Sequence, residues 1–357
     1  MTAVKCHGCG GTLQNADADA PFYTPKPPAE DVLCQRCYRM RHYGEILPAR
    51  VDARAYADML KEARIEHALV VNVVDLFDLE GSILPNINAL TNQSDVLVAL
   101  NKRDVLPRSV NDGKLRHRAL PMLKRRGLQA KDAVVVSAEK KIGIDRLIDR
   151  IAHMAHGRDI YVVGATNVGK SSLINAMLSA AAERKLNPIT VSKARGTTQG
   201  LIAIPFEDST LFDTPGLFNP HHASALLDDA AMKQIQPTKE IKPRVYQLSP
   251  PQTLFLAALA RFDIEATSPV SAIVYAADAV NVHRRKTEGA DAFFTTHGGE
   301  RLTPFVGDLD AKTSFSFRQG KHDIVIPGLA FVSLSGPVRV TVHTPKGLNP
   351  YKRGALI

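Results

Sequence analysis

The segment Gly164–Ser171 has the residue types of a phosphate-binding loop. It reads Gly-Ala-Thr-Asn-Val-Gly-Lys-Ser and matches the pattern G-x-x-x-x-G-K-[ST] in full. Glycines let the backbone turn so that its N–H groups point at phosphate oxygens, and a helix that follows adds the positive end of its dipole. Lys170 would reach the β- and γ-phosphates, and the Ser171 hydroxyl would bind Mg²⁺. The residues predicted to contact nucleotide here are Gly164, Asn167, Val168, Gly169, Lys170, Ser171 and Ser172.

A second motif, Asn101-Lys102-Arg103-Asp104, indicates which base is bound. Its carboxylate can accept two hydrogen bonds from N1–H and N2–H₂ of guanine, whereas adenine offers no such donor pair and would leave the carboxylate unpaired. Asn101 would tie this loop to the phosphate loop, and the stem of Lys102 would cover one face of the base. The pair Ser137-Ala138 comes after a later apolar run, where the Ala138 N–H could meet guanine O6.

Two further segments have the residue types of nucleotide-sensing switches. In Asp213-Thr-Pro-Gly216, Asp213 would hold the Mg²⁺ shell and the Gly216 N–H would meet the γ-phosphate. Upstream, Gly196-Thr-Thr198 lies in a polar segment long enough for a mobile first switch. Thr198 is favoured over Thr197 as the Mg²⁺ ligand, and the alternative for either threonine is a simple strand entry.

Leu217 stands where Ras-like proteins carry the glutamine that orients the attacking water. Leucine cannot orient water, so hydrolysis needs another group, an ion or a partner, and slow intrinsic turnover is expected. Asn167 suggests one route, because a loop reading G-x-x-N-x-G-K-S resembles those of GTPases that bind K⁺ beside the phosphates. A potassium ion there would stabilise charge in the transition state.

The order of the motifs predicts a circular permutation. GTPases ordinarily run phosphate loop, first switch, D-x-x-G, N-K-x-D and S-A, but here the base-reading motifs precede the phosphate loop. One site can still form, because permutation preserves packing where the old termini lie close together. Two separate nucleotide domains are the rival explanation, and it fails because each half lacks the motifs that the other supplies.

The elements that must position these motifs alternate in type between residues 49 and 220. Short β-branched runs are predicted strands, at Ala68–Val74, Asp95–Leu100, Ala133–Val136, Ile160–Val163, Leu201–Phe206 and Thr210–Phe212. Helical patterns lie near 53–64, 112–126, 143–155 and 170–181. The alternation predicts an α/β fold with a mostly parallel sheet: a circularly permuted P-loop GTPase domain.

Two smaller regions flank this domain. Residues 1–48 hold Cys6, Cys9, Cys34 and Cys37 as two C-x₂-C pairs with 24 residues between them. Four thiolates suit tetrahedral, structural Zn²⁺, so a zinc module is predicted, with redox pairs or disulfides as the alternative. Residues 221–357 predict an α+β domain with a helix near 252–260 and strands at Val270–Ala276, Ile324–Ile326, Ala330–Leu334 and Val338–His343.

The amino-acid composition limits the kinds of molecule that the protein is expected to bind. The net charge is +9 and the pI about 9.4, which favours an acidic partner such as RNA but does not establish one. No run approaches the length of a membrane span and the first residues resemble no targeting peptide, so a cytoplasmic protein with no membrane partner is expected. Basic clusters that could contact RNA, each of which could equally be a solvated face, surround the second cysteine pair and lie at 124–126, 283–286 and 351–353.

Together these features resemble the YqeH family of circularly permuted GTPases over nearly the whole chain. The resemblance rests on the two C-x-x-C pairs, Val74–Ser82 (Val-Asp-Leu-Phe-Asp-Leu-Glu-Gly-Ser), the motifs above and the ending Val342–Gly347. It implies a GTP switch in assembly of the small ribosomal subunit, with rRNA or a subunit precursor as partner and no DNA. Arg195 departs from the family, which often has proline before Gly-Thr-Thr, and this bears on the shape of the first switch.

Two rival functions remain open. One is an RNA-independent regulatory GTPase whose zinc module binds a protein, and salt-sensitive binding to rRNA would argue against it. The other is an NTPase acting on a small molecule, which would turn over rapidly without a partner. Leu217 already argues against that second rival.

Overall fold

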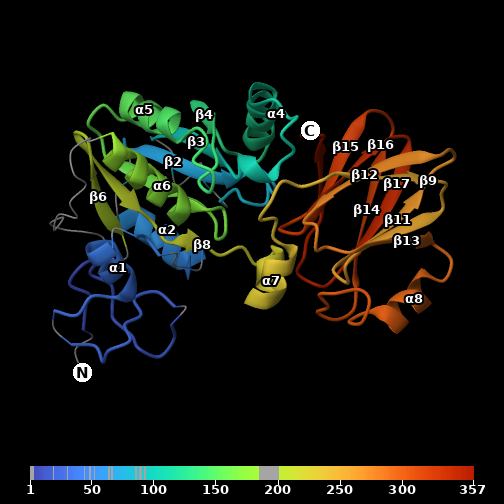
Figure 1. Cartoon of the computed structure of the whole chain (residues 1–357), viewed down its shortest axis with the longest axis horizontal. Coiled ribbons are helices and arrows are strands. Elements are labelled where there is room, and N and C mark those ends of the chain that lie inside the picture. Colours follow the sequence, from blue (N-terminus) through green and yellow to red (C-terminus); the bar gives the residue numbers. More distant parts are fainter. Residues whose placement is uncertain are drawn as a thin grey trace. The chain divides into compact units, whose positions relative to one another are not determined.

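The computed structural model describes residues 4–184 and 201–357, except 19, 30, 44, 48–49, 52, 63–64, 66, 85–86, 88–90 and 92–93. The chain forms two compact units (Figure 1). One comprises Met1–Arg103 and Arg116–Phe218, and the other comprises Asp104–Leu115 and Asn219–Ile357. The cysteines and the phosphate loop therefore belong to the first unit, and the C-terminal strands to the second.

A six-stranded sheet in the order β4-β3-β2-β5-β7-β6 forms the centre of the first unit. Its strands are β2 (Leu69–Asp75), β3 (Asp95–Asn101), β4 (Asp132–Val135), β5 (Ile160–Val163), β6 (Ile202–Phe206) and β7 (Ser209–Asp213). All neighbours run parallel except β6 and β7. β-Branched runs are buried on both faces, as a covered parallel sheet requires. The predicted strands and the mostly parallel sheet are confirmed.

Helices follow the strands at the four places that the sequence predicts. They are α2 (Ala53–Glu62), α4 (Asp112–Arg125), α5 (Ile144–Ala155) and α6 (Lys170–Glu183). In α5 the buried residues recur at helical spacing, because Ile144, Leu147, Ile148 and Ile151 share one face. Among the residues that the structure describes, no helix combines the length and apolarity needed to cross a membrane.

The cysteine-bearing segment adds a short helix and a strand to this unit. Helix α1 (Gln35–Tyr43) begins directly after Cys34 and includes Cys37. Strand β1 (Arg50–Val51) pairs in parallel with β8 (Gly216–Leu217), which begins at the glycine of the Asp-Thr-Pro-Gly motif. Residues 50–51 and 216–217 are therefore neighbours although they lie far apart in sequence.

The second unit is built around two antiparallel five-stranded sheets, in the orders β13-β10-β11-β17-β14 and β18-β15-β16-β12-β9. The strands are β9 (Arg244–Leu248), β10 (Gln252–Leu256), β11 (Ala260–Glu265), β12 (Val270–Ala276), β13 (Val282–Lys286), β14 (Ala311–Phe317), β15 (Lys321–Ile326), β16 (Ala330–Ser335), β17 (Val338–Thr344) and β18 (Tyr351–Gly354). One apolar core takes side chains from both sheets, such as Phe262 and Val340 from the first and Val274 and Val332 from the second. The α component is small: a 3₁₀ turn η2 (Ala223–Ala225) and the short helices α7 (Asp229–Ile235) and α8 (Ala290–His297).

The helix predicted near 252–260 is wrong, because this stretch forms β10, a turn and the start of β11. Its sequence contains a continuous apolar run, Leu254–Ala260, and every residue in that run is buried. A strand that is covered on both faces shows no alternation, so periodicity cannot separate it from a buried helix. The four strands predicted further on are all confirmed as parts of β12, β15, β16 and β17.

Candidate nucleotide site and cysteine cluster

The phosphate loop connects β5 to α6 and is shaped by its glycines. Gly169 has a φ of 85°, and a Cβ built on it would lie 2.5 Å from Asn101 Nδ2. A Cβ on Gly164 would lie 3.0 Å from the carbonyl oxygen of Val73. Both positions therefore require close backbone approach, which any larger residue would obstruct. The loop ends at the N-terminus of α6, where backbone N–H groups and the helix dipole favour a phosphate.

Asn101, at the end of β3, connects three loops. Its Nδ2 donates to the carbonyl oxygen of Val168 at 2.9 Å, and its Oδ1 accepts from the N–H of Ala138 at 3.1 Å. One amide group thus joins the Asn-Lys-Arg-Asp segment, the phosphate loop and the Ser-Ala turn. Ser137 is buried beside it, and its hydroxyl accepts from the N–H of Lys140 at 2.9 Å.

Lys102 has a partner that motif reasoning did not assign. Its Nζ donates to Asp75 Oδ2 at 2.7 Å, and its backbone adopts a φ of 65°. Asp75 is in turn oriented by Ser82, whose hydroxyl accepts from the Asp75 N–H at 3.0 Å. Both partners belong to Val74–Ser82, which the sequence marks only as a family feature. The contact gives that segment a physical role, because it holds the lysine of the base-reading motif.

The phosphate-loop lysine is paired with the carboxylate of the Asp-Thr-Pro-Gly motif. Lys170 Nζ donates to Asp213 Oδ1, and Arg36 Nη2, from helix α1, donates to Asp213 Oδ2. Burial lowers the pKa of Lys170; the Asp213 carboxylate opposes that shift, and the charge of Arg36 adds to it. The Asp213 side chain is completely buried, so its negative charge needs these two cations close by.

The residues after Asp213 are tied to the phosphate loop by backbone hydrogen bonds. The N–H of Leu217 donates to the Gly164 oxygen at 3.1 Å, and the N–H of Thr166 donates to the Leu217 oxygen at 2.8 Å. Thr214 donates from its hydroxyl to the Val162 oxygen at 2.9 Å. The Leu217 side chain is buried and offers no polar group to a nucleophile. Segment 213–217 is thus held against the phosphate loop by both its backbone and its side chains.

The remaining predicted nucleotide contacts are distributed as follows. The first turn of α6 contains Ser171 and Ser172. Asn167 is exposed in the phosphate loop and has a φ of 66°. Asp104 lies in the short turn η1 (Arg103–Val105). The first switch, with Arg195, Thr197 and Thr198, lies outside the described residues. The hydroxyl of Ser171 and the carboxylate of Asp213 are oxygen donors of the kind that Mg²⁺ prefers.

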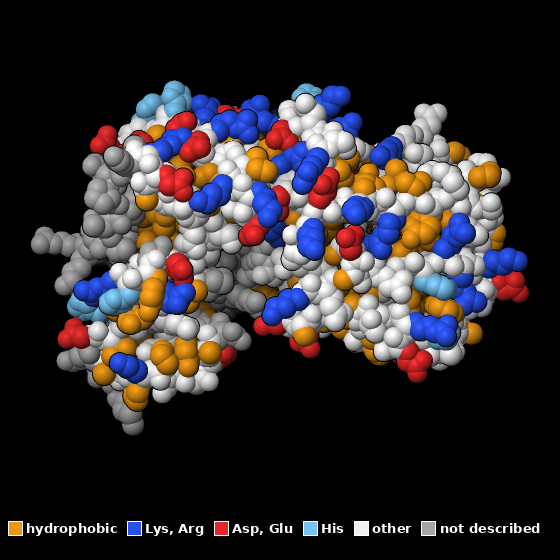
Figure 2. Space-filling view, viewed as in Figure 1, with side chains coloured by type: hydrophobic (Ala, Val, Ile, Leu, Met, Phe, Trp, Pro, Cys, Tyr) orange, Lys and Arg blue, Asp and Glu red, His pale blue; other side chains and the backbone are white. Residues whose placement is uncertain are grey.

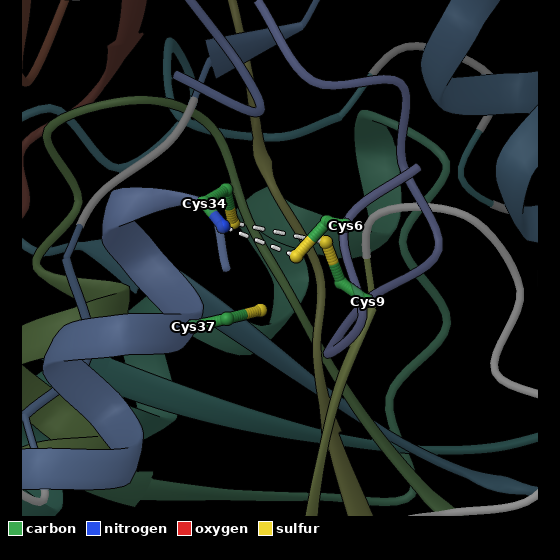
Figure 3. Close-up of side chains that lie close together, drawn as sticks. All are labelled: Cys6, Cys9, Cys34 and Cys37. Carbon is green, nitrogen blue, oxygen red and sulfur yellow. Dashed lines mark hydrogen bonds between the residues drawn. The ribbon is translucent and has the colours of Figure 1, made fainter. Parts of the chain in front are cut away.

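The four cysteines converge on one point (Figure 3). All are buried, none forms a disulfide, and their sulfur atoms lie within 4.8 Å of one another. Backbone N–H groups of Gly8 and Cys34 donate to Cys6 Sγ at 3.4 and 3.2 Å. Hydrogen bonds from Cys34, Cys37 and Cys9 hold the pKa of the Cys6 thiol below its usual range. A four-sulfur donor set with N–H···S bonds fits a structural metal ion such as Zn²⁺.

Two of the basic residues flagged as RNA candidates face inward instead. Arg353 is buried, donates to Asp323 Oδ2 at 3.1 Å and stacks over the Phe331 ring. Arg36 is the ion-pair partner of Asp213. Basic clusters predicted to lie on the surface therefore include residues whose side chains make contacts inside the fold. A run of basic residues in the sequence does not show which way each side chain points.

These features define the class: a circularly permuted P-loop GTPase with an N-terminal four-cysteine module, and GTP hydrolysis is its activity. Residues 53–222 match the family described as "RsgA GTPase", and residues 269–356 match "YqeH-like, C-terminal". The class implies GTP or GDP and Mg²⁺ as ligands.

The chain belongs to the YqeH family. It is 37% identical to "Uncharacterized protein YqeH" of Bacillus subtilis (strain 168), and the match covers 100% of both chains. It is 28% identical to "NO-associated protein 1, chloroplastic/mitochondrial" of Arabidopsis thaliana, over 98% of this chain and 72% of that one. The crystal structure of YjeQ from Thermotoga maritima matches with a TM-score of 0.27 and 25% identity, over 42% of this chain and 48% of that one.

Proposed function

We propose that the chain is a cytoplasmic GTP-dependent switch that acts in assembly of the small ribosomal subunit and binds rRNA or a precursor particle. The proposal extends the family resemblance and rests on one surface in particular, the edge strand β13 with helix α8. Figure 2 shows many Lys and Arg side chains, interspersed with Asp and Glu, on the visible surface of each unit, and the net charge of the chain is +9. A surface with excess positive charge attracts the phosphate backbone of a nucleic acid at long range.

The β13–α8 surface combines cations with an aromatic ring. Strand β13 is the edge of its sheet, with Arg284 and Lys286 exposed on one side of it and His283 and Arg285 on the other side, against α8. The Arg285 guanidinium lies 4.6 Å from the centre of the Phe293 ring, and the His283 ring stacks on Phe293 at 4.4 Å. Cations beside a stacked aromatic group are typical of surfaces that bind single-stranded RNA.

The cysteine module offers a second exposed surface. Tyr38 and Tyr43 of α1 are 47% and 60% exposed, and Arg41 is exposed on the same helix. These aromatic groups also suit a protein partner, which is the observation favouring an RNA-independent regulatory GTPase as the second candidate function. The two functions differ in their dependence on salt, because release of counterions from a phosphate backbone makes RNA binding weaken steeply as salt rises.

Co-sedimentation with ribosomal particles tests the proposal. Selective migration with small-subunit particles in a non-hydrolysable GTP analogue, and less in GDP, is the expected result. Arg285→Glu, a reversal of the cation on the Phe293 ring, should abolish it, whereas Lys114→Glu, a reversal of an exposed lysine on α4, should not. Association with no particle in either nucleotide state, together with capture of a protein partner that is insensitive to salt, would establish the second function instead.

We also propose that turnover is slow and stimulated by K⁺ bound near Asn167. The exposed Asn167 side chain stands in a loop whose backbone is arranged for phosphates, and Leu217 supplies no polar group. Single-turnover rates measured in equimolar KCl and NaCl test this. A higher rate in KCl that disappears in Asn167→Ala is expected, and equal rates in the two salts would refute it.

A further inference from the structure

Arg36 stands between two of the predicted zinc ligands, in Cys34-Gln-Arg-Cys37, and its side chain reaches the nucleotide site. Its Nη2 pairs with Asp213 Oδ2, and its Nε donates to the Leu47 oxygen at 3.2 Å. Only 11% of the side chain is exposed. These contacts hold the guanidinium on the Asp213 side of the site.

Two cations pair with one carboxylate at this point. Arg36 and Lys170 hold the two oxygens of one carboxylate, so three buried groups carry a net charge of +1. The two cations lie within roughly 8 Å of each other, the sum of two hydrogen bonds and the width of a carboxylate. A second buried cation close to the phosphate-loop lysine complements a polyphosphate, on which negative charge shifts during phosphoryl transfer.

The module that carries Arg36 is also tied to the helix that begins with Lys170. The Ile46 N–H donates to Asn175 Oδ1 at 2.9 Å, and Asn175 Nδ2 donates to the Ile46 oxygen at 3.3 Å. Asn175 lies in α6, on the residues that follow the phosphate loop. The segment after α1 is therefore attached to the GTPase machinery at a second point, independent of the Arg36 ion pair.

We propose that Arg36 is a catalytic residue of the GTPase, a cis-acting arginine that the cysteine module supplies to the γ-phosphate. Water attacks the γ-phosphorus, the bond to the β–γ bridging oxygen breaks, GDP leaves with that electron pair, and the protons of the water remain on the phosphate product. Arg36 stays protonated throughout and contributes only charge. It stabilises charge in the transition state, a role separate from the orientation of water that Leu217 cannot provide, and it makes turnover depend on the folded cysteine cluster.

Three variants of the full-length protein test this: Arg36→Ala, Arg36→Lys and, as a charge-matched control, Arg41→Ala on the exposed face of the same helix. In single-turnover assays Arg36→Ala should lower the rate at least about 100-fold while KM for GTP changes less than about threefold. Arg36→Lys keeps the positive charge but lacks the planar guanidinium, so its single-turnover rate should lie between those of the parent and Arg36→Ala. Arg41→Ala should match the parent.

GDP with aluminium fluoride mimics the transferring phosphoryl group. A structural defect would weaken binding of this complex and of GDP alone to a similar extent, whereas loss of a catalytic arginine would weaken only the complex. Arg36→Ala should lose this complex and keep its affinity for GDP alone. Zinc content of one ion per chain would show that the module remains folded. A rate that is unchanged or raised, or an equal loss of GDP and of the aluminium fluoride complex, would overturn the proposal. These assays use the isolated protein, so they stand whatever the ribosomal experiments show.

Discussion

At the scale of single residues, the site depends on side chains that join segments far apart in the chain. Asn101 is the clearest case, because its amide pairs with both the phosphate loop and the Ser-Ala turn. Asn101→Ala removes both bonds and leaves the Ala138 N–H without that partner. The expected cost is about 1–3 kcal/mol of nucleotide affinity, or roughly 5- to 150-fold in the Kd for GDP. Equilibrium titration with a fluorescent GDP measures it.

The exposed Asn349→Ala serves as control for that measurement, since Asn349 lies near the end of the chain and belongs to none of the nucleotide-binding motifs. An Asn101→Ala protein that binds GDP as tightly as the parent would show that the backbone alone shapes the loop.

Sequence reasoning found the residues that recur in fixed motifs and missed those defined only by contact. Asn101, Lys170 and Asp213 each lie in a short pattern whose chemistry dictates its members. Arg36 and Asp75 lie in no such pattern, and they enter the site because the fold brings α1 beside β7 and β2 beside the base-reading loop. Their signals in the sequence were indirect: a basic residue between two cysteines, and a family segment without an assigned role.

At the scale of elements, the local sequence pattern predicted a helix or strand correctly where the element has one exposed face or a typical length. Helix α5 shows a clear apolar stripe and was predicted within a residue or two of its observed bounds. The β10–β11 hairpin was not, because burial on both sides removed its alternation. Helix α1 was missed for another reason: it is short, it is polar on average, and its buried residues include Cys37, a predicted metal ligand.

The turn between the first two cysteines has no space for a larger residue. A Cβ on Gly8 would lie 2.8 Å from Cys37 Sγ and 2.9 Å from Cys37 Cβ. Gly8→Ala should therefore push α1 away from the first cysteine pair and lower the zinc content, which is measured by metal analysis of the purified protein. Gly113→Ala in the exposed first turn of α4 should keep the parent's zinc content. Full zinc occupancy in Gly8→Ala would contradict the close packing of the turn between Cys6 and Cys9 against Cys37.

A buried ion cluster joins three strands of the second unit and predicts a pH dependence. Burial alone would raise the pKa of Asp263, but hydrogen bonds from His343, Arg261 and Thr253 outweigh it and lower the pKa from 3.8 to about 2. Because the folded state holds this carboxylate ionised, its contribution is complete above about pH 5 and is lost as the pH falls toward 2. The shift corresponds to about 2 kcal/mol.

Urea unfolding followed by circular dichroism between pH 2 and pH 6 measures that contribution. The parent should lose stability through this window, and Asp263→Asn should be less stable at pH 6 with a flatter dependence. Asp308→Asn, a change at an exposed carboxylate of the same unit, should keep the parent's profile. Parallel profiles for the parent and Asp263→Asn would show that other carboxylates dominate.

At the scale of the whole molecule, permutation changes what the second switch is connected to. Segment 213–217 is hydrogen-bonded to the phosphate loop, and the longer of the two segments that form the second unit begins at Asn219, two residues after β8 ends. A change at Gly216 when the γ-phosphate is lost would therefore pull directly on the chain that enters the second unit. In the unpermuted order, that segment would lead onward into the GTPase domain itself.

This connection can be cut without touching either site. Insertion of a flexible Gly/Ser linker of about ten residues between Phe218 and Asn219 should leave GTP turnover within about twofold, because Asp213, Lys170 and the phosphate loop are unchanged. The difference in particle binding between the GTP analogue and GDP should disappear, because a slack chain transmits no tension. The same linker placed between Gln319 and Gly320, in an exposed turn between β14 and β15, should preserve that difference. Retained nucleotide dependence in the first insertion would mean that the switch acts through surfaces of the first unit or through the chain at 103–104 and 115–116, and not through the connection at Phe218–Asn219.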